Sequence, residues 1–249
     1  MRPVLKKLLL APLRLLGYEV VTYSRYHALL RYLVETNPDF FFVQVGANDG
    51  KSFDVPFYEF VVSHNCRGIV LEPLQDVYQK LVENYKSCPS VTPLNLGLHP
   101  SKQRCLLFRV SPAQLPRLPA WAVGIGSFVK GHHQKSGIPP DAIVAEEVEC
   151  IHLMELLAKH NVPRLHLLQV DVEGFDAEVI RMLDFKLIQP LVIKFERVNL
   201  APADLREIST LLRKRGYHLL REGPDTIAVS KKLHGWRRAI ALGSHRRCA

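Results

Sequence analysis

Short apolar runs recur along most of the chain and alternate with stretches that repeat apolar residues every three or four positions. The first run, residues 39–45, is apolar almost throughout and ends at Gly46, which is typical of a strand buried on both faces of a parallel sheet. Comparable runs follow at residues 68–71, 91–96, 165–170, 191–195, 217–220 and 226–229. The helical spacing predicts helices over residues 76–85, 152–160, 177–183 and 202–215.

This alternation of strands and helices predicts an α/β fold with a right-handed, doubly wound and mostly parallel sheet. The last two apolar runs have no helix between them, so we expect a hairpin that closes the sheet with an antiparallel edge. Ligands of such sheets bind beyond the carboxyl ends of the strands. The strand ends are therefore the places to search for functional residues.

Residues 111–141 interrupt the alternation. They hold five prolines and four glycines, together with the adjacent pair His132 and His133. A long irregular segment inside a compact fold is usually a lid, a binding loop or a disordered stretch. We expect a lid or substrate-binding loop here.

The two ends of the chain differ from its middle in charge. Residues 1–34 carry a net charge of +5 and residues 231–249 a net charge of +6, whereas the residues between them carry −2. The spacing of apolar residues predicts short amphipathic helices over 5–16 and 26–35. We therefore expect a basic helical extension over residues 1–37, a folded domain over 38–230 and a basic tail over 231–249.

The cationic ends have two interpretations. They predict peripheral contact with an anionic membrane or a polyanion, or they only keep the protein soluble. We expect no transmembrane segment, because Lys6, Lys7, Arg14 and Glu19 interrupt the most hydrophobic stretch. The five cysteines are widely spaced and form no CxxC pair, which disfavours a disulfide framework and a structural zinc site. A cytoplasmic location is the expectation.

Two strand ends carry residues suited to a nucleotide-like cofactor. The first strand runs into Gly46-Ala47-Asn48-Asp49-Gly50, whose glycines permit a tight turn and a close approach of the backbone to a ligand. Glu72 ends the second strand, 26 positions after Gly46, where a carboxylate accepts hydrogen bonds from two ribose hydroxyls. Taken alone, the glycines fit an ordinary turn and Glu72 fits a helix N-terminus. Together they favour a cofactor that contains a nucleoside.

Acidic residues end the fourth and fifth main strands. Asp171 and Glu173 follow the run 165–170, and Glu196 follows the run 191–195. Clustered carboxylates raise one another's pKa, which suits a general base or an oxygen-ligated divalent ion. Asp176 fits better as the cap of the helix that follows it.

Six segments together resemble the FkbM family of methyltransferases. They are Phe42–Gly50, Leu71–Pro73, Asn95–Leu98, Gly126–Phe128, Gln169–Phe175 and Lys194–Glu196, in the family's order over residues 38–230. The segment Val170–Phe175 (VDVEGF) is the most specific of these. The resemblance implies a class I methyltransferase fold, Rossmann-like, with a seven-stranded sheet that binds S-adenosyl-L-methionine. It also implies methyl transfer to a hydroxyl oxygen, often of a glycan sugar or a secondary metabolite.

The resemblance assigns roles to the cofactor-binding residues. It implies that the loop with Gly46, Asn48, Asp49 and Gly50 holds the methionine part of the cofactor, that Glu72 holds the ribose, and that Asn95 and Leu96 hold the adenine. Gln44 departs from the acid that many class I enzymes place there. Asp49 or Asp171 would then contact the cofactor's amino group.

Methyl transfer to an alcohol requires a group that accepts the hydroxyl proton. The candidates for this base are Asp171, Glu173, His132 and His133. Asp171 ranks first because it lies at a strand end, whereas paired histidines in a loop are more often solvated. The sequence leaves open whether a divalent metal binds, and Asp171 and Glu196 would be its ligands.

Three rival functions remain to be compared. A nicotinamide-dependent oxidoreductase lacks support because the chain has no GxGxxG after its first strand. A non-catalytic module that binds anions or membrane surfaces through its basic ends is the main alternative from another class. Nucleic-acid methylation agrees with the basic composition, but the chain lacks an aromatic-interleaved basic patch and an NPPY-like tetrapeptide.

Overall fold

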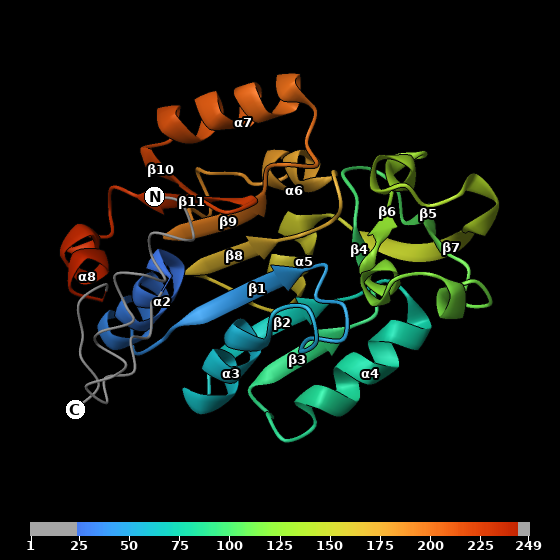
Figure 1. The fold of residues 1–249 in the computed structure, drawn as a ribbon. Coiled ribbons are helices and arrows are strands. Elements are labelled where there is room, and N and C mark those ends of the chain that lie inside the picture. The colour runs from blue at the N-terminus through green and yellow to red at the C-terminus, as the bar shows by residue number, and fades with distance from the viewer. Residues whose placement is uncertain (1–23, 244–249) are drawn as a thin grey trace, which may run out of the picture. The chain divides into compact units, whose positions relative to one another are not determined.

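The computed structural model describes residues 24–243, which fall into two compact units (Figure 1). The larger unit covers residues 39–233. Of the described residues, 24–38 and 234–243 form the smaller unit. The helix predicted over residues 5–16 lies outside the described residues, as does the end of the basic tail.

The larger unit is built on a seven-stranded sheet in the order β10-β11-β9-β8-β1-β2-β3. All neighbouring strands are parallel except at β11, which is antiparallel to both β10 and β9. The predicted α/β fold with an antiparallel edge hairpin is therefore confirmed. The strands are β1 (Phe41–Val45), β2 (Arg67–Leu71), β3 (Val91–Leu94), β8 (Leu167–Val170), β9 (Val192–Glu196), β10 (Tyr217–Glu222) and β11 (Asp225–Ser230).

Helices cover both faces of this sheet. Side chains of β1, β8 and β9 such as Val43, Leu168 and Ile193 share one core with α5 (Leu153–Lys159), α6 (Asp176–Arg181) and α7 (Pro202–Lys214). On the opposite face Phe42 meets Phe57 of α3 (Val55–Ser63) edge to face, with ring centroids 5.4 Å apart. Tyr58 of α3 in turn contacts Tyr85 of α4 (Gln75–Tyr85). Burial on both faces explains why the strand sequences lack polar alternation.

The helix α3 was missed by the sequence analysis. It is nine residues long, and its apolar residues do not repeat with a clear helical period. Its start is set locally instead, because Asp54 accepts a hydrogen bond from the Phe57 N–H and Pro56 occupies the first turn. These capping residues alone did not predict the helix, because the glycines and serines before them are typical of a loop.

A second, four-stranded sheet lies beyond the carboxyl ends of the main strands (Figure 1). Its order is β4-β7-β5-β6, formed by β4 (Gly97–Leu98), β5 (Arg104–Val110), β6 (Gly126–Ser127) and β7 (Ile143–Ile151). We call residues 104–151 the insertion. The sequence analysis did not predict β5 and β7. The sequence of β7 carries three glutamates, and the short apolar run of β5 stands between Arg104 and Arg109.

The segment 111–141 is the connection between β5 and β7 within the insertion. It contains β6 and four short 3₁₀ helices, at Leu115–Arg117, Ala120–Gly124, His132–Ser136 and Pro140–Ala142. A small apolar cluster that includes Val110, Ile125 and Ile138 holds it together. The segment is thus folded on a core of its own.

The insertion is anchored to the main layer by a buried guanidinium. Arg109 of β5 donates to both carboxylate oxygens of Asp76 in α4, at 2.6 and 2.8 Å, and to Glu146 of β7 at 3.3 Å. Apolar contacts accompany this ion pair, because Leu74 and Val77 share a cluster with Leu107 of the insertion. Asp76 lies four positions after Glu72, in the first turn of α4.

In the smaller unit, α2 (Arg25–Thr36) and α8 (Trp236–Gly243) pack together. Ser24 caps α2 by accepting from the His27 N–H at 3.1 Å, and the Tyr32 hydroxyl donates to the His234 carbonyl at 2.6 Å. Within residues 24–243, no helix has both the length and the apolar character that a membrane crossing requires.

The anchor predicts an asymmetric response to mutation. Arg109 is 4% exposed, whereas the side chain of Asp76 is 53% exposed. Asp76→Ala leaves a buried cation with less compensation and should lower the free energy of unfolding by about 3 kcal/mol. Arg109→Met leaves a carboxylate that water can solvate, and should cost only about 1 kcal/mol.

Urea denaturation of both variants measures this difference. Glu83→Ala, which removes an exposed carboxylate from the same helix, is the matched control and should change stability by less than about 0.5 kcal/mol. A larger loss for Arg109→Met than for Asp76→Ala would contradict the assignment of Arg109 as the costly buried partner.

Candidate active site

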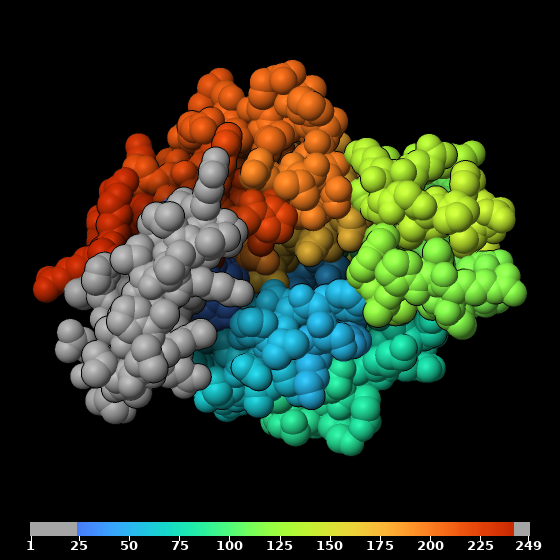
Figure 2. All heavy atoms as spheres, in the orientation of Figure 1, coloured from blue at the N-terminus to red at the C-terminus, as the bar shows by residue number. Residues whose placement is uncertain are grey.

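A cavity opens between the carboxyl ends of β1, β2 and β8 and the insertion. About 580 Å³ of space free of protein atoms lies within it, the solvent at its mouth included. Figure 1 shows β1 pointing toward the insertion, and Figure 2 shows the insertion (green to yellow-green) bordering the main layer. The residues that line the cavity include Val45, Gly46, Asn48, Glu72, Pro73, Leu74, Leu96, Leu98, Leu107, Gly124, Gly126, Phe128, Asp171, Val172, Glu173 and Phe175.

Gly46 allows three strand ends to meet. Its φ is +75°, and a Cβ on it would lie 1.9 Å from the Asp171 carbonyl oxygen, so a side chain is sterically excluded. The N–H groups of Gly46 and Ala47 both donate to the Leu71 carbonyl of β2, at 3.1 and 2.8 Å. The turn after β1 is therefore pressed between β2 and β8.

Glu72 lies on the wall of the cavity as a buried carboxylate. Its Oε2 accepts from the Asn48 N–H at 3.0 Å and its Oε1 accepts from the Leu74 N–H at 2.9 Å. Burial raises the pKa of Glu72 to about 7, although these two hydrogen bonds oppose the shift. Each oxygen retains acceptor capacity, so the carboxylate suits a ligand with neighbouring hydroxyls.

Four of the predicted cofactor-binding residues have other neighbours. Gln44 and Gly50 do not line the cavity, and the Gln44 Oε1 is buried with no hydrogen-bond partner among the described residues. The Asn95 amide donates to the Glu72 and Pro73 carbonyls, both at 2.9 Å, so it fixes the loop after β2, whereas Leu96 lines the cavity. Asp49 also lies outside the cavity lining.

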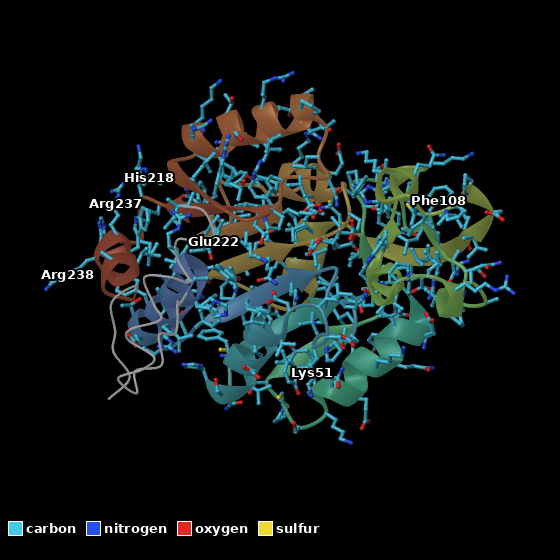
Figure 3. The ribbon with its side chains drawn as sticks, viewed as in Figure 1. Lys51, Phe108, His218, Glu222, Arg237 and Arg238 are labelled. Atoms are coloured by element: carbon cyan, nitrogen blue, oxygen red, sulfur yellow. The ribbon has the colours of Figure 1, made fainter. Side chains whose placement is uncertain are left out.

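Asp49 stabilises the turn that follows Gly46 instead. Its Oδ1 accepts from the N–H groups of Lys51 and Ser52, and its Oδ2 accepts from the Ser52 hydroxyl. Burial by itself would raise the pKa of Asp49, but the hydrogen bonds from Ser52 and Lys51 outweigh it and lower the pKa. The Lys51 ammonium (Figure 3) stands over the Tyr58 ring, 5.4 Å from its centre.

Asp171 is the carboxylate that faces the open cavity from the end of β8. Its side chain is accessible to water, yet protein atoms surround it on most sides because it lies on the floor of a concave site. This partial desolvation and the nearby carboxylates of Asp176, Glu196 and Glu173 raise its pKa well above the ordinary value, while Lys194 opposes the shift.

Asp176 connects the ends of β8 and β9. It is fully buried, and its carboxylate accepts from the N–H groups of Glu196 at 3.0 Å and Val172 at 3.4 Å. Burial raises the pKa of Asp176 to about 7. The sequence analysis expected a helix cap, but Asp176 is the first residue of α6, and its side chain accepts from the end of β9 and from the loop after β8 instead. Capping was therefore the wrong interpretation.

Glu173 and the two histidines lie where the insertion meets the strand ends. The Glu173 Oε2 is 2.9 Å from the His132 Nε2 and accepts from the Asn199 amide at 2.9 Å. The same amide donates to Glu196 at 2.6 Å. His133 faces the Ile125 carbonyl at 3.2 Å, and burial lowers its pKa. Both histidines are 1% exposed, so the solvated surface expected for them is wrong.

Asn199 and Ser127 are site residues that the sequence analysis assigned no role. Asn199 lies three positions after Glu196, in the loop beyond β9. A search of the residues that follow each strand could therefore have found it. Ser127 donates to the Glu173 carbonyl at 2.7 Å from a strand that the apolar pattern did not reveal. Neither residue type is distinctive by itself.

The candidate metal ligands do not form a complete site. Among the described residues, no group of three or more His, Cys, Asp or Glu side chains is arranged to hold a metal ion. Asp171 and Glu196 interact electrostatically as like charges. We therefore derive no catalytic step through a metal.

Comparison with known proteins adds a family match. The family model described as Methyltransferase FkbM domain matches residues 44–219. Searching curated proteins found no relative of this chain.

Solved structures with a similar course of the chain are methyltransferases of low sequence identity. An O-methyltransferase from Bacillus cereus in complex with SAH is 10% identical, covers 92% of each chain and has a TM-score of 0.43. A ribosomal protein L11 methylase from Lactobacillus delbrueckii subsp. bulgaricus is 9% identical, covering 82% of this chain and 76% of its own at a TM-score of 0.40. A precorrin-6y C5,15-methyltransferase from Geobacter metallireducens GS-15 is 12% identical, covering 85% and 89% at 0.38.

The raised pKa of Glu72 predicts how stability depends on pH. The folded state holds this proton more tightly than the unfolded state, whose pKa is near 4.5, so Glu72 stabilises the empty protein most below that pH. This contribution is lost as the pH rises through about 7, and its full size is of order 3 kcal/mol.

Urea denaturation between pH 5 and 8 tests this for Glu72→Gln, which has no titrating group at this position. We expect the decline of unfolding free energy with pH to be shallower in the variant than in the wild type. Glu59→Gln, which changes an exposed carboxylate on α3, should keep the wild-type slope. Equal slopes for Glu72→Gln and wild type would show that Glu72 ionises normally.

Proposed function

The chain belongs to the FkbM methyltransferase domain family, and from this premise we propose that it methylates a hydroxyl oxygen of a sugar, a glycan or a secondary metabolite. S-adenosyl-L-methionine is the methyl donor, and when bound it supplies a methyl group activated by a sulfonium. The observation that carries the proposal is the cavity between Gly46 and Glu72, at the carboxyl ends of β1 and β2.

The residues of the cavity fit this cofactor. Gly46, Asn48 and Asp171 line one part of the cavity, which suits the methionine part of the cofactor. The Glu72 carboxylate is placed to accept from the two ribose hydroxyls. The apolar wall that Leu74, Leu107 and Phe128 form suits the adenine, together with Leu96 and Leu98.

We assign the role of general base to Asp171. An aspartate of ordinary pKa is a weak base near neutral pH, and the desolvation and like charges around Asp171 increase its basicity. A cation in the cavity would favour the ionised carboxylate, so Asp171 is ready to accept a hydroxyl proton when the donor is bound. Asp176 and Glu196 support this role through their charge.

The charge of the site favours an uncharged acceptor. Asp171 and Glu173 line the cavity, Glu196 interacts with both through its charge, and these carboxylates repel an anionic substrate. Neutral hydroxyl groups donate hydrogen bonds to such carboxylates. A neutral sugar fits the site better than a uronic acid or a phosphorylated sugar, and a panel of these acceptors with labelled methyl donor tests this order.

Binding of S-adenosylhomocysteine is the first test of the proposal. Titration calorimetry should show binding to the wild type, and Glu72→Ala should weaken it by about 10- to 100-fold because hydrogen bonds to a charged group are lost. Glu83→Ala changes an exposed glutamate of α4 and should leave the affinity unchanged. Undiminished affinity in Glu72→Ala would remove Glu72 from the ribose site.

Asp171→Asn separates catalysis from binding. The variant keeps the shape of the side chain and removes its basicity, so turnover should fall about 100-fold or more while the dissociation constant of S-adenosylhomocysteine changes far less. Both quantities are measured on one protein, with Asp141→Asn as an exposed control in the insertion. Near-normal turnover would show that another group accepts the hydroxyl proton.

A further inference from the structure

Glu173 is the point where three separate segments of the larger unit meet. The insertion contributes His132 and Ser127, which bond to the Glu173 carboxylate and to its carbonyl at 2.9 and 2.7 Å. The loop after β9 contributes Asn199, whose amide reaches the same carboxylate oxygen at 2.9 Å. All of these contacts converge on one residue of the loop after β8.

The backbone of Glu173 is held in an unfavourable conformation. Its φ is +52°, in the left-handed region that costs energy for a residue with a Cβ. Gly174 follows with φ +94°, and a Cβ on it would lie 3.2 Å from the Asn199 carbonyl and 3.3 Å from the His132 Nδ1. Strain of this kind persists only where the surrounding contacts stabilise it.

These contacts leave little freedom for proton transfer by Glu173 or His132. The Glu173 Oε2 already lies within hydrogen-bond distance of the His132 ring and the Asn199 amide, which leaves this oxygen little acceptor capacity for a substrate hydroxyl. The His132 ring is 1% exposed, its Nε2 faces Glu173, and its Nδ1 is buried without a hydrogen-bond partner in the described part of the chain. Glu173 and His132 are therefore held in fixed positions by their contacts.

The contacts of Glu173 determine where one wall of the cavity stands. Gly124, Gly126 and Phe128 of the insertion line the cavity directly, and Gly126 belongs to β6. Arg109, which forms the ion pair with Asp76, lies opposite Gly126 on β5, so this ion pair holds β5 and β6. Release at Glu173 would therefore free the segment around His132 while β5 and β6 stay attached through Arg109.

We propose that Glu173, His132 and Asn199 form a positioning joint that holds the insertion closed over the cofactor cavity, and that Glu173 and His132 take no part in proton transfer. This inference rests on the proposed function for the identity of the ligand in the cavity. The closure of the insertion depends only on contacts within the protein, so that part of the inference does not depend on the proposed function.

Two substitutions of Glu173 separate positioning from catalysis. Glu173→Gln retains a carbonyl oxygen that accepts from both His132 and Asn199 but is not a base, whereas Glu173→Ala loses both contacts. We expect Glu173→Gln to keep turnover and the affinity for S-adenosylhomocysteine within about threefold of wild type. Glu173→Ala should weaken that affinity about tenfold or more, because the cavity wall is no longer fixed.

Limited trypsin digestion measures how tightly the insertion is held, and it requires no ligand. Arg117, Lys130 and Lys135 are cleavage sites within the segment 111–141. In Glu173→Ala, cleavage in this segment should accelerate about tenfold, while cleavage elsewhere stays slow because only the insertion opens. Glu147→Ala, which removes an exposed carboxylate of β7 on the insertion, is the matched control and should digest like the wild type.

Asn199→Ala provides a second variant should Glu173→Ala fail to fold. It removes a donor from the partly exposed loop after β9 and should accelerate cleavage to a lesser degree. Unchanged digestion in both variants would overturn the joint. A 100-fold loss of turnover in Glu173→Gln with normal affinity would also overturn it, since Glu173 would then be the base. Failure of the wild type to bind S-adenosylhomocysteine would instead refute the proposed function and leave the digestion result to decide on the joint.

Discussion

The close approach of Gly46 to the backbone of Asp171 is the constraint on which the site depends. A Cβ on Gly46 would lie 1.9 Å from the Asp171 carbonyl oxygen, so only glycine lets the turn after β1 pass against the end of β8. The same turn donates two hydrogen bonds to Leu71 and brings the Asn48 N–H onto Glu72. The glycine therefore places the ribose-binding candidate and the candidate base at opposite sides of one cavity.

Buried carboxylates give this site its chemistry and make the empty protein sensitive to pH. Glu72 and Asp176 each lose hydration, and burial raises the pKa of both to about 7. Hydrogen bonds from backbone N–H groups hold these carboxylates in place without restoring their ordinary pKa. A site of this kind is better compensated when a cationic donor occupies it, which agrees with the methyl donor of the family.

The insertion forms one wall of the cavity beyond the carboxyl ends of the main strands. It is attached by an ion pair at Arg109 and by the joint at Glu173, and its residues Leu107 and Phe128 complete the apolar wall. The residues of the joint include two that sequence reasoning treated as candidate bases. The burial of His132 and its hydrogen bond with Glu173 favour a positioning role for this pair, whereas Asp171 is open to the cavity.

The sequence by itself determined where the main strands and most helices other than α3 lie along the chain, because strands buried on both faces need continuous apolar runs and helices need a periodic apolar face. It also located Gly46, Glu72 and Asp171, since the carboxyl ends of parallel strands meet at one edge of the sheet. Only the tertiary structure decided which polar residues face the cavity. Asp49 bonds to its own turn and His132 is buried against Glu173, and these outcomes depend on contacts between segments far apart in the chain. The strands β5 and β7 were missed for the same reason, because their formation depends on their pairing with each other across the segment 111–141.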